Sequence, residues 1–221
     1  MILTHGSNSI SREVVPPQTY VTIGGRQYKT VTIGNQEWLA ENLDYKFAYS
    51  GSTLPIGRSD APKTPAAWYY DNYEATYGIE GTYKCGLLYN WYAAKYLNDN
   101  KSTLLPSGWH VPTNDEWDVL KNEIGAVTAG TKLKALDGSI ATAWPSSWNG
   151  SDDYGFGGIP SGYRSSNKGF YDFGSSASYW TVTSTGVNYA RGAELGNYAY
   201  LGGSESTKWG AYALRLVKDV T

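Results

Sequence analysis

Residues 105–117 read LPSGWHVPTNDEW, and this stretch holds the clearest structural signal in the chain. Its second half is a capping box, in which the Thr113 side chain accepts from the backbone amide of Glu116 and the Glu116 carboxylate accepts from that of Thr113. Because both bonds satisfy donors that the first turn of a helix leaves free, a helix is predicted to begin here and to end at Gly125. The apolar residues that follow share one helical face: Trp117, Leu120 and Ile124.

Toward the N-terminus, two further patterns indicate regular structure. Residues 87–97 are good helix formers without a breaker and predict a second helix. Its buried side would carry three residues: Leu88, Trp91 and Tyr92. The tetrapeptide VTIG at residues 21–24 recurs at 31–34, and its β-branched residues next to glycine predict a β-hairpin. Between these patterns, the glycines and prolines of residues 50–63 predict a loop.

Toward the C-terminus, the chain changes character after residue 137. It becomes rich in Gly, Ser, Asn, Tyr and Trp with frequent turn signals, which predicts short strands joined by long loops. The clearest strands are predicted at 178–184 and 211–218. The predicted fold class is therefore α+β, with two helices, short antiparallel strands and long loops. It forms one domain over residues 19–221, preceded by an N-terminal tail or attachment segment at 1–18.

The composition excludes several classes of protein. The 221 residues include 20 Tyr, 9 Trp and 4 Phe and carry a net charge of −2, so we expect neither a disordered chain nor an electrostatic binder of nucleic acid. No apolar stretch is long enough for membrane insertion, and the N-terminus lacks the pattern of a secretory signal peptide. Cys85 is the only cysteine, which excludes an intrachain disulfide, and we expect it to be a small buried apolar residue.

Residues that could carry catalysis or hold a metal are sparse, and the sequence predicts no catalytic residue, metal site or cofactor. We expect His110 to be a packed, hydrogen-bonded residue. Asp152 and Asp153 are the residue types of a glycosidase carboxylate pair, but adjacent residues on an extended chain point in opposite directions, and Asp beside Gly is typical of turns. Asn149 and Asp172 add oxygen ligands of the kind Ca²⁺ takes, without EF-hand spacing.

The best candidate for function is a recognition surface in the C-terminal third. Residues 181–212 combine large rings with Gly, Ser, Thr, Ala and Asn, which is the composition of loops that offer rigid contact area and adaptable hydrogen bonding. The alternative is that these rings fill a β core. We expect polar residues between the rings, Lys208 among them, to face solvent. The predicted ligand-binding residues are Thr183, Asn188, Arg191, Glu194, Asn197, Tyr198, Tyr200 and Trp209.

Several segments together resemble a known family. The stretch at 105–117 is similar to the LPSGWHVPTDAEW signature of the Fibrobacter succinogenes major paralogous domain. Other segments agree in order: IGNQEWLAENL at 33–43, WNGSDDYGF at 148–156, PSGYR at 160–164, SYWT at 178–181 and LRLVKD at 214–219. The resemblance covers about residues 20–219. It implies a C-type-lectin-like fold, in the variant shared with formylglycine-generating enzymes.

The resemblance does not extend to the activities of related proteins. Formylglycine-generating enzymes work through paired cysteines, whereas this chain has Cys85 alone. The Glu-Pro-Asn and Gln-Pro-Asp motifs of calcium-dependent lectins are absent, and WNG at 148–150 stands in place of Trp-Asn-Asp. The start of the chain resembles proteins of phages and prophages of gut Bacteroides. Some of those are variable proteins of diversity-generating retroelements, whose C-terminal surface is mutagenised to change ligand.

These inferences predict a non-enzymatic ligand-binding or adhesion protein that is virion-associated or extracellular. Its variable C-terminal surface would bind a cell-surface protein or glycan of a host bacterium, for example as a phage receptor-binding protein. The tail would attach it to a particle or form a homo-oligomer. Two alternatives stay open. An enzyme-like relative of the formylglycine-generating fold, or a carboxylate glycosidase, would need a deep pocket with perturbed carboxylates. A structural decoration or pilus-like subunit would bury its rings between subunits.

Overall fold

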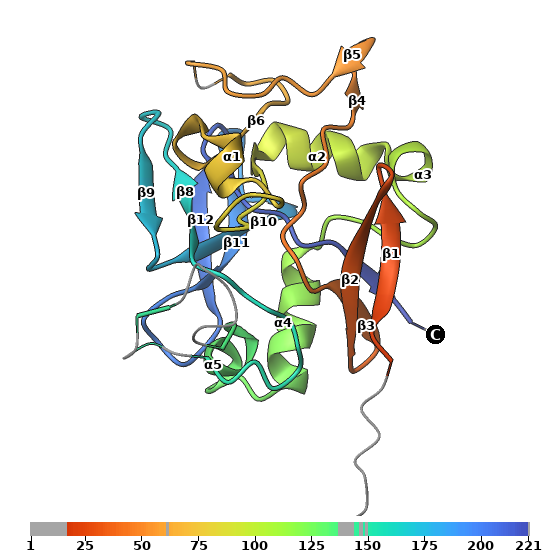
Figure 1. Cartoon of the computed structure of the whole chain (residues 1–221), viewed down its shortest axis with the longest axis vertical. Helices are drawn as coiled ribbons and strands as arrows, with labels where there is room; N and C mark the ends of the chain where they lie inside the picture. The colour runs from red at the N-terminus through yellow and green to blue at the C-terminus, as the bar shows by residue number, and fades with distance from the viewer. Residues whose placement is uncertain (1–16, 61, 137–143, 146–147, 149, 221) are drawn as a thin grey trace, which may run out of the picture.

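The computed structural model describes residues 17–60, 62–136, 144–145, 148 and 150–220, and Figure 1 shows how their elements are arranged. They form the mixed α+β fold that the sequence predicts. Among the described residues, the two longer helices are α2 (Trp91–Asp99) and α4 (Asn114–Glu123). The short helices are η1 (Tyr70–Asn72), α1 (Glu74–Tyr77), α3 (Lys101–Leu104) and α5 (Ala129–Leu133).

A four-stranded antiparallel sheet joins the two ends of the described chain, in the order β1-β2-β3-β14. Its strands are β1 (Thr19–Ile23), β2 (Arg26–Ile33), β3 (Gln36–Leu39) and β14 (Val217–Asp219). The predicted hairpin is confirmed, but the two VTIG copies do not pair with each other. Each copy ends a strand, and its glycine enters the following turn with φ of +58° at Gly24 and +57° at Gly34. The second copy therefore pairs with β3, where Val31 lies opposite Trp38.

The larger, eight-stranded sheet has the order β12-β11-β10-β8-β13-β7-β6, with β9 paired to β8. Its pairs are antiparallel apart from β10 with β8. The strands are β6 (Ala67–Trp68), β7 (Leu88–Asn90), β8 (Ser161–Arg164), β9 (Phe170–Phe173), β10 (Ala177–Ser184), β11 (Tyr189–Leu195), β12 (Gly202–Thr207) and β13 (Ala211–Tyr212). A separate hairpin, β4 (Ala48–Tyr49) with β5 (Ser52–Thr53), opens the loop predicted at 50–63.

Two predicted elements differ from the structure. Residues 88–90 form strand β7, and the helix begins only at Trp91, because the Asn90 side chain accepts from the Ala93 amide as an N-cap. Leu88 and Trp91 are buried as expected, whereas Tyr92 is only partly buried. The single strand predicted at 211–218 is two short strands, β13 and β14. Residues 213–217, which run from the end of β13 into β14, are all buried. They therefore lack the alternation of buried and exposed side chains that is typical of a half-exposed strand.

The central strands of the larger sheet are buried on both faces, whereas the residues of β9 and β12 are partly buried or exposed. Neighbouring residues on one strand belong to different core clusters: Tyr179 packs with Trp117 of α4, and Trp180 packs with Trp91 of α2. Helix α4 buries Trp117, Leu120 and Ile124, as predicted from its spacing. Cys85 is 1% exposed, which confirms the expected buried thiol. No helix in the described part of the chain is long and apolar enough to cross a membrane.

Candidate functional site

The predicted ligand-binding residues lie on strands β10 and β11 and in the segments next to β11 and β12, at one end of the larger sheet. In the β11–β12 pair, Arg191 lies opposite Glu205 and Glu194 lies opposite Gly202. Because side chains alternate along a strand, Arg191 and Glu194 point to opposite faces of the sheet. Arg191 shares its face with Ala193, which packs into the cluster that contains α4. The structure therefore divides the predicted residues between two faces.

One group does come together, around the loop that joins β11 to β12. Tyr198 and Tyr200 stack with ring centroids 4.4 Å apart and an interplanar angle of 17°. Tyr200 is 51% exposed, Tyr198 is partly buried, and Asn197 between the strand and the rings is exposed. Burial and then the charge and hydrogen bonding of Glu194 raise the pKa of the Tyr198 hydroxyl above its usual value. Glu194, Asn197, Tyr198 and Tyr200 form what we call the tyrosine loop site.

A buried lysine fixes this loop from below. Lys134 is 2% exposed, and its ammonium donates to the carbonyls of Gly196 at 2.6 Å, Tyr198 at 3.0 Å and Trp148 at 3.3 Å. Burial lowers its pKa. Gly130 of α5 also lies against the loop, since a Cβ there would come within 2.2 Å of the Tyr200 carbonyl oxygen. The backbone that carries the two rings is therefore held in one conformation.

Sequence reasoning missed Lys134 as a residue of this site. Its only local signal is its position between two residues that are themselves buried, Leu133 and Ala135. Its partners lie as far as 64 positions away, so no spacing pattern marks it.

The other predicted residues lie outside the tyrosine loop site. The Thr183 hydroxyl accepts from the Asn114 amide at 2.9 Å and so helps to cap α4. Asn188 is partly buried, and its carbonyl accepts from the Lys208 amide. Trp209 is partly buried, with the Lys63 ammonium 5.0 Å from its ring centroid. These three residues contact neighbouring segments around β10–β12 and do not lie together on one surface.

The buried residues of the 181–212 segment include a lysine and a tyrosine, Lys208 and Tyr212. Lys208, expected to face solvent, is 6% exposed. Its ammonium donates to Ser184 Oγ at 2.7 Å and to the Gly186 carbonyl at 2.6 Å, and it lies 4.2 Å from the Trp91 ring centroid. The expectation was wrong because these partners replace water around the charge. Tyr212 is also buried and stacks on Trp180, so the alternative of a β core holds for this ring.

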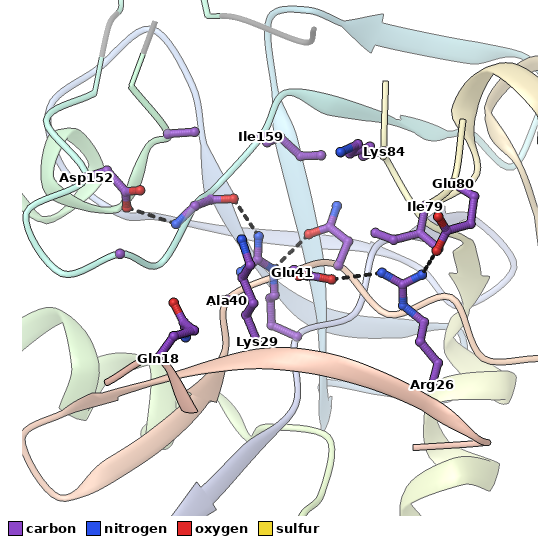
Figure 2. A pocket seen from close by; sticks show the side chains of 15 residues that line it. Gln18, Arg26, Lys29, Ala40, Glu41, Ile79, Glu80, Lys84, Asp152 and Ile159 are labelled. Atoms are coloured by element: carbon purple, nitrogen blue, oxygen red, sulfur yellow. Dashed lines mark hydrogen bonds and ion pairs between the residues drawn. The ribbon is translucent and has the colours of Figure 1, made fainter. Parts of the chain in front are cut away.

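A second feature is a charged cleft of about 470 Å³, which Figure 2 shows from close by. It lies among the small sheet, the 79–84 segment and the 152–159 segment. Its charged lining residues are Arg26, Lys29, Glu41, Glu80, Lys84, Asp152 and Arg215. We call it the charged cleft.

A carboxylate glycosidase would need two carboxylates that face one pocket, and the charged cleft does not place Asp152 and Asp153 in this way. Asp152 lines it, and burial raises the pKa of its carboxyl, although hydrogen bonding from the Gly157 amide and the charge of Arg215 act in the opposite direction. Its Oδ1 accepts from the Gly157 amide at 2.9 Å, which shapes the 152–157 turn. Asp153 does not line the cleft and is exposed. The two carboxylates therefore do not face one pocket together.

His110 is hydrogen-bonded on both ring nitrogens, as expected of a packed residue. Nδ1 lies 2.9 Å from the Gly108 carbonyl oxygen, and Nε2 pairs with Glu116. The bond to Glu116 raises the pKa of His110. Glu116 closes the predicted capping box with Thr113, which the structure confirms.

Metal ligands do not gather in the described residues, where no group of three His, Cys, Asp or Glu side chains is placed to hold an ion. Asn149, one of the candidate oxygen ligands, lies outside them, as does nearly all of the predicted tail.

These observations define a loop-rich α+β domain with an exposed aromatic loop at one sheet edge and a separate charged cleft. The chain belongs to the Fibrobacter succinogenes major domain family, whose model matches residues 31–218. Neither a curated protein nor a solved structure gives a significant match. The family predicted from the motifs around residues 105–117 is thus confirmed.

Proposed function

We propose that this protein is a non-enzymatic ligand-binding or adhesion protein and that its contact surface centres on the tyrosine loop site. The observation that carries the proposal is the stacked pair of Tyr198 and Tyr200, with half of Tyr200 exposed. Tyrosines are effective contact residues because they offer a large amphipathic surface at a small entropy cost. Glu194 and Asn197 beside the rings supply hydrogen-bonding groups for a polar partner.

The rigid support of the loop strengthens the proposal. A contact loop that is ordered before binding loses less conformational entropy when a partner arrives. Lys134 provides that order through three backbone carbonyls, and none of its bonds uses a side chain of the loop. The side chains at 197, 198 and 200 can therefore change while the backbone stays in place.

This arrangement suits the variable, lectin-like surface that the resemblance implies. Substitutions at exposed positions usually change stability by no more than about 0.5 kcal/mol, so a fixed loop tolerates many side chains. We extend the proposal to a phage-borne or extracellular protein whose partner is a cell-surface protein or glycan of a host bacterium. The neighbouring DNA tests the diversification. A near-copy of the 3′ coding end that differs mainly at adenines, followed by a reverse transcriptase gene, would support it.

The two alternatives have less support. A carboxylate glycosidase needs two facing carboxylates, and in the charged cleft Asp152 is bound to a turn amide while Asp153 points elsewhere. A structural subunit would bury the stacked rings against a second copy, which the experiment below can detect.

The experiment measures binding of the labelled protein to a panel of intact gut bacteria and immobilised bacterial glycans. The double variant Tyr198→Ala with Tyr200→Ala should lose at least about tenfold in affinity, because central aromatic contacts are each worth about 2 kcal/mol or more. Tyr189→Ala is the matched control, since Tyr189 is 47% exposed on β11 outside the site. Unchanged binding by the folded double variant would refute the proposal. Loss of self-association in size-exclusion chromatography would favour the structural subunit.

A further inference from the structure

The charged cleft is a second place where this chain has the dimensions of a ligand site. Its volume of about 470 Å³ falls within the range of small-molecule pockets. Its walls come from well-separated parts of the chain and include Arg26 and Lys29 of β2, Lys84 and Asp152. No lining residue belongs to residues 183–209, so the cleft is separate from the tyrosine loop site.

Most charges in the cleft already have partners within the protein. Arg26 pairs with Glu41 at 3.1 Å and with Glu80. Arg215 is fully buried, and its guanidinium donates to Asn42 Oδ1 and to three backbone carbonyls. The Asp152 carboxylate accepts from the Gly157 amide. These groups shape the cleft and leave little capacity for a ligand.

Two ammonium groups remain. Lys29 extends from the β2 side and Lys84 lies across the cleft from it, as Figure 2 shows. Neither ammonium has a hydrogen bond or ion pair with another residue in the described chain, in contrast to Arg26. The Nε of Arg26 is buried and also has no hydrogen-bond partner there. Lys29 and Lys84 are both exposed, so among the described residues the cleft presents two unpaired ammonium groups to solvent beside the carboxylates of its lining.

We propose that the charged cleft binds a small ligand that carries a carboxylate and no aromatic ring, with Lys29 and Lys84 as the groups that recognise the carboxylate. An anion between two ammonium groups gains charge-assisted hydrogen bonds from both. Among the described residues no aromatic side chain lines the cleft, so these residues offer no stacking surface for a ring.

The lining favours a carboxylate over a phosphate. Protein phosphate sites typically combine helix N-termini or backbone amide nests with a free guanidinium fork. None of the lining residues lies at a helix N-terminus. The two terminal nitrogens of Arg26 are paired with carboxylates, and the Arg215 guanidinium donates to carbonyls and to Asn42 Oδ1. Two point charges are sufficient for a carboxylate.

The test is a titration of the full-length, ¹⁵N-labelled protein followed by NMR at constant ionic strength. The probes are succinate, glutarate and inorganic phosphate, with chloride as the reference ion. Succinate or glutarate should give saturable shifts of the amides of Lys84, Gly155 and Gly157 at millimolar concentration, and phosphate should give weaker shifts. The absence of saturable shifts with either carboxylate, or tighter binding of phosphate, would overturn the proposal.

Variants assign the binding to the two lysines. Lys29→Gln with Lys84→Gln should weaken carboxylate binding at least about tenfold, because hydrogen bonds to charged groups are the stronger class. Lys101→Gln with Lys168→Gln is the matched control: both lysines are exposed, lie outside the cleft, and give the same change in charge. Equal weakening in both double variants would show a general charge effect and refute the assignment. Tyr198→Ala with Tyr200→Ala should leave carboxylate binding unchanged, so the two sites are tested separately.

Discussion

Arg215 shows how much of this fold one side chain can connect. It lies in the irregular stretch between β13 and β14, is 0% exposed, and donates to Leu39, Asn42, Phe156 and Gly157 at 2.6–2.9 Å. Because it joins segments more than 50 positions apart, it ties the small sheet to the 152–157 turn. Its charge is satisfied by neutral acceptors, so removal leaves several buried carbonyls without a donor.

We expect Arg215→Met to lower the free energy of unfolding by about 3–5 kcal/mol, because several buried acceptors lose their donor and each unsatisfied group costs about 1–3 kcal/mol. Urea denaturation at neutral pH measures the change. Arg215→Lys keeps the charge but offers fewer donors and should lose an intermediate amount. A methionine variant within 1 kcal/mol of the parent, on the scale of a single hydrogen bond, would contradict this account.

Lys134 should be needed to keep residues 196–200 of the loop between β11 and β12 ordered. Lys134→Met fills a similar volume but removes the donor to Gly196, Tyr198 and Trp148. We expect the amides of residues 196–200 to exchange hydrogen faster and the unfolding free energy to fall by about 1–3 kcal/mol. Hydrogen exchange measured by NMR tests both. Exchange that increases uniformly over the whole chain would show that Lys134 has no special role in the loop.

At the scale of elements, the N-terminus of α4 is hydrogen-bonded to distant parts of the chain. Thr113 and Glu116 form the capping box, and Thr183 of β10 accepts from the Asn114 amide. Gln36 of β3 donates to the Glu116 carbonyl at 3.1 Å. The start of this helix therefore contacts both sheets.

Thr183→Val should remove the cap from β10 while keeping the side-chain shape. We expect a loss of about 1 kcal/mol in unfolding free energy, which is typical of a helix cap. Thr185→Val is the matched control, since Thr185 is exposed and its hydroxyl has no partner in the described residues. Equal stability of the two variants would show that the Thr183 bond contributes nothing.

The pair of His110 and Glu116 predicts how stability depends on pH. The His110 pKa is raised above 6.5, so its contribution is complete below about pH 6.5 and is lost as the pH rises through the raised value. Burial alone would raise the pKa of Glu116, but bonds from His110 and Thr113 outweigh it and the pKa lies below 4.5. The Glu116 contribution is present above about pH 4.5 and is lost as the pH falls through the lowered value.

His110→Gln should therefore destabilise the protein most between about pH 5 and 6, where both groups of the parent are charged, and less near pH 9. Thermal unfolding of parent and variant across this range gives the difference at each pH. A difference that is constant with pH would show that the His110–Glu116 charge pair does not contribute to stability.

Features whose partners are close in the sequence could be predicted, whereas features whose partners are distant could not. The capping box was predictable because its partners are three residues apart. Strand β7 was not, because residues 88–90 become a strand through pairing with β13 over more than 100 positions, which overrides the local helix preference. The burial of Lys208 and the bond from Asn114 to Thr183 could not be predicted for the same reason. Their partners, Ser184 and Asn114, lie 24 and 69 positions away.

For the whole molecule, the two largest core clusters share one sheet. Leu88 and Tyr179 face the cluster with α4, while their neighbours Tyr89 and Trp180 face the cluster with α2. Loss of either cluster would expose one face of the same strands. We therefore predict a single cooperative unfolding transition, with tryptophan fluorescence and far-UV circular dichroism giving the same midpoint. Two separate midpoints would show that the clusters unfold independently.

The two candidate sites differ in how far the sequence could locate them. The composition of residues 181–212 indicated the region that contains the tyrosine loop site, and Tyr198 and Tyr200 were among the predicted ligand-binding residues. It could not indicate that Arg191 and Glu194 point to opposite faces, since that follows from strand register. No local sequence pattern indicates the charged cleft, because Lys29, Lys84 and Asp152 come from three distant segments.

The pairing of β3 with β14 has a consequence for biosynthesis. Glu37 and Lys218 are 181 positions apart, yet they are partners in the same sheet. At typical translation speeds, residues 36–43 leave the ribosome roughly 10–40 s before their partners at 214–219. During that interval the nascent β-hairpin has an open edge and an uncovered Trp38. We expect a chaperone that shields hydrophobic strands to increase the yield of this protein in cells.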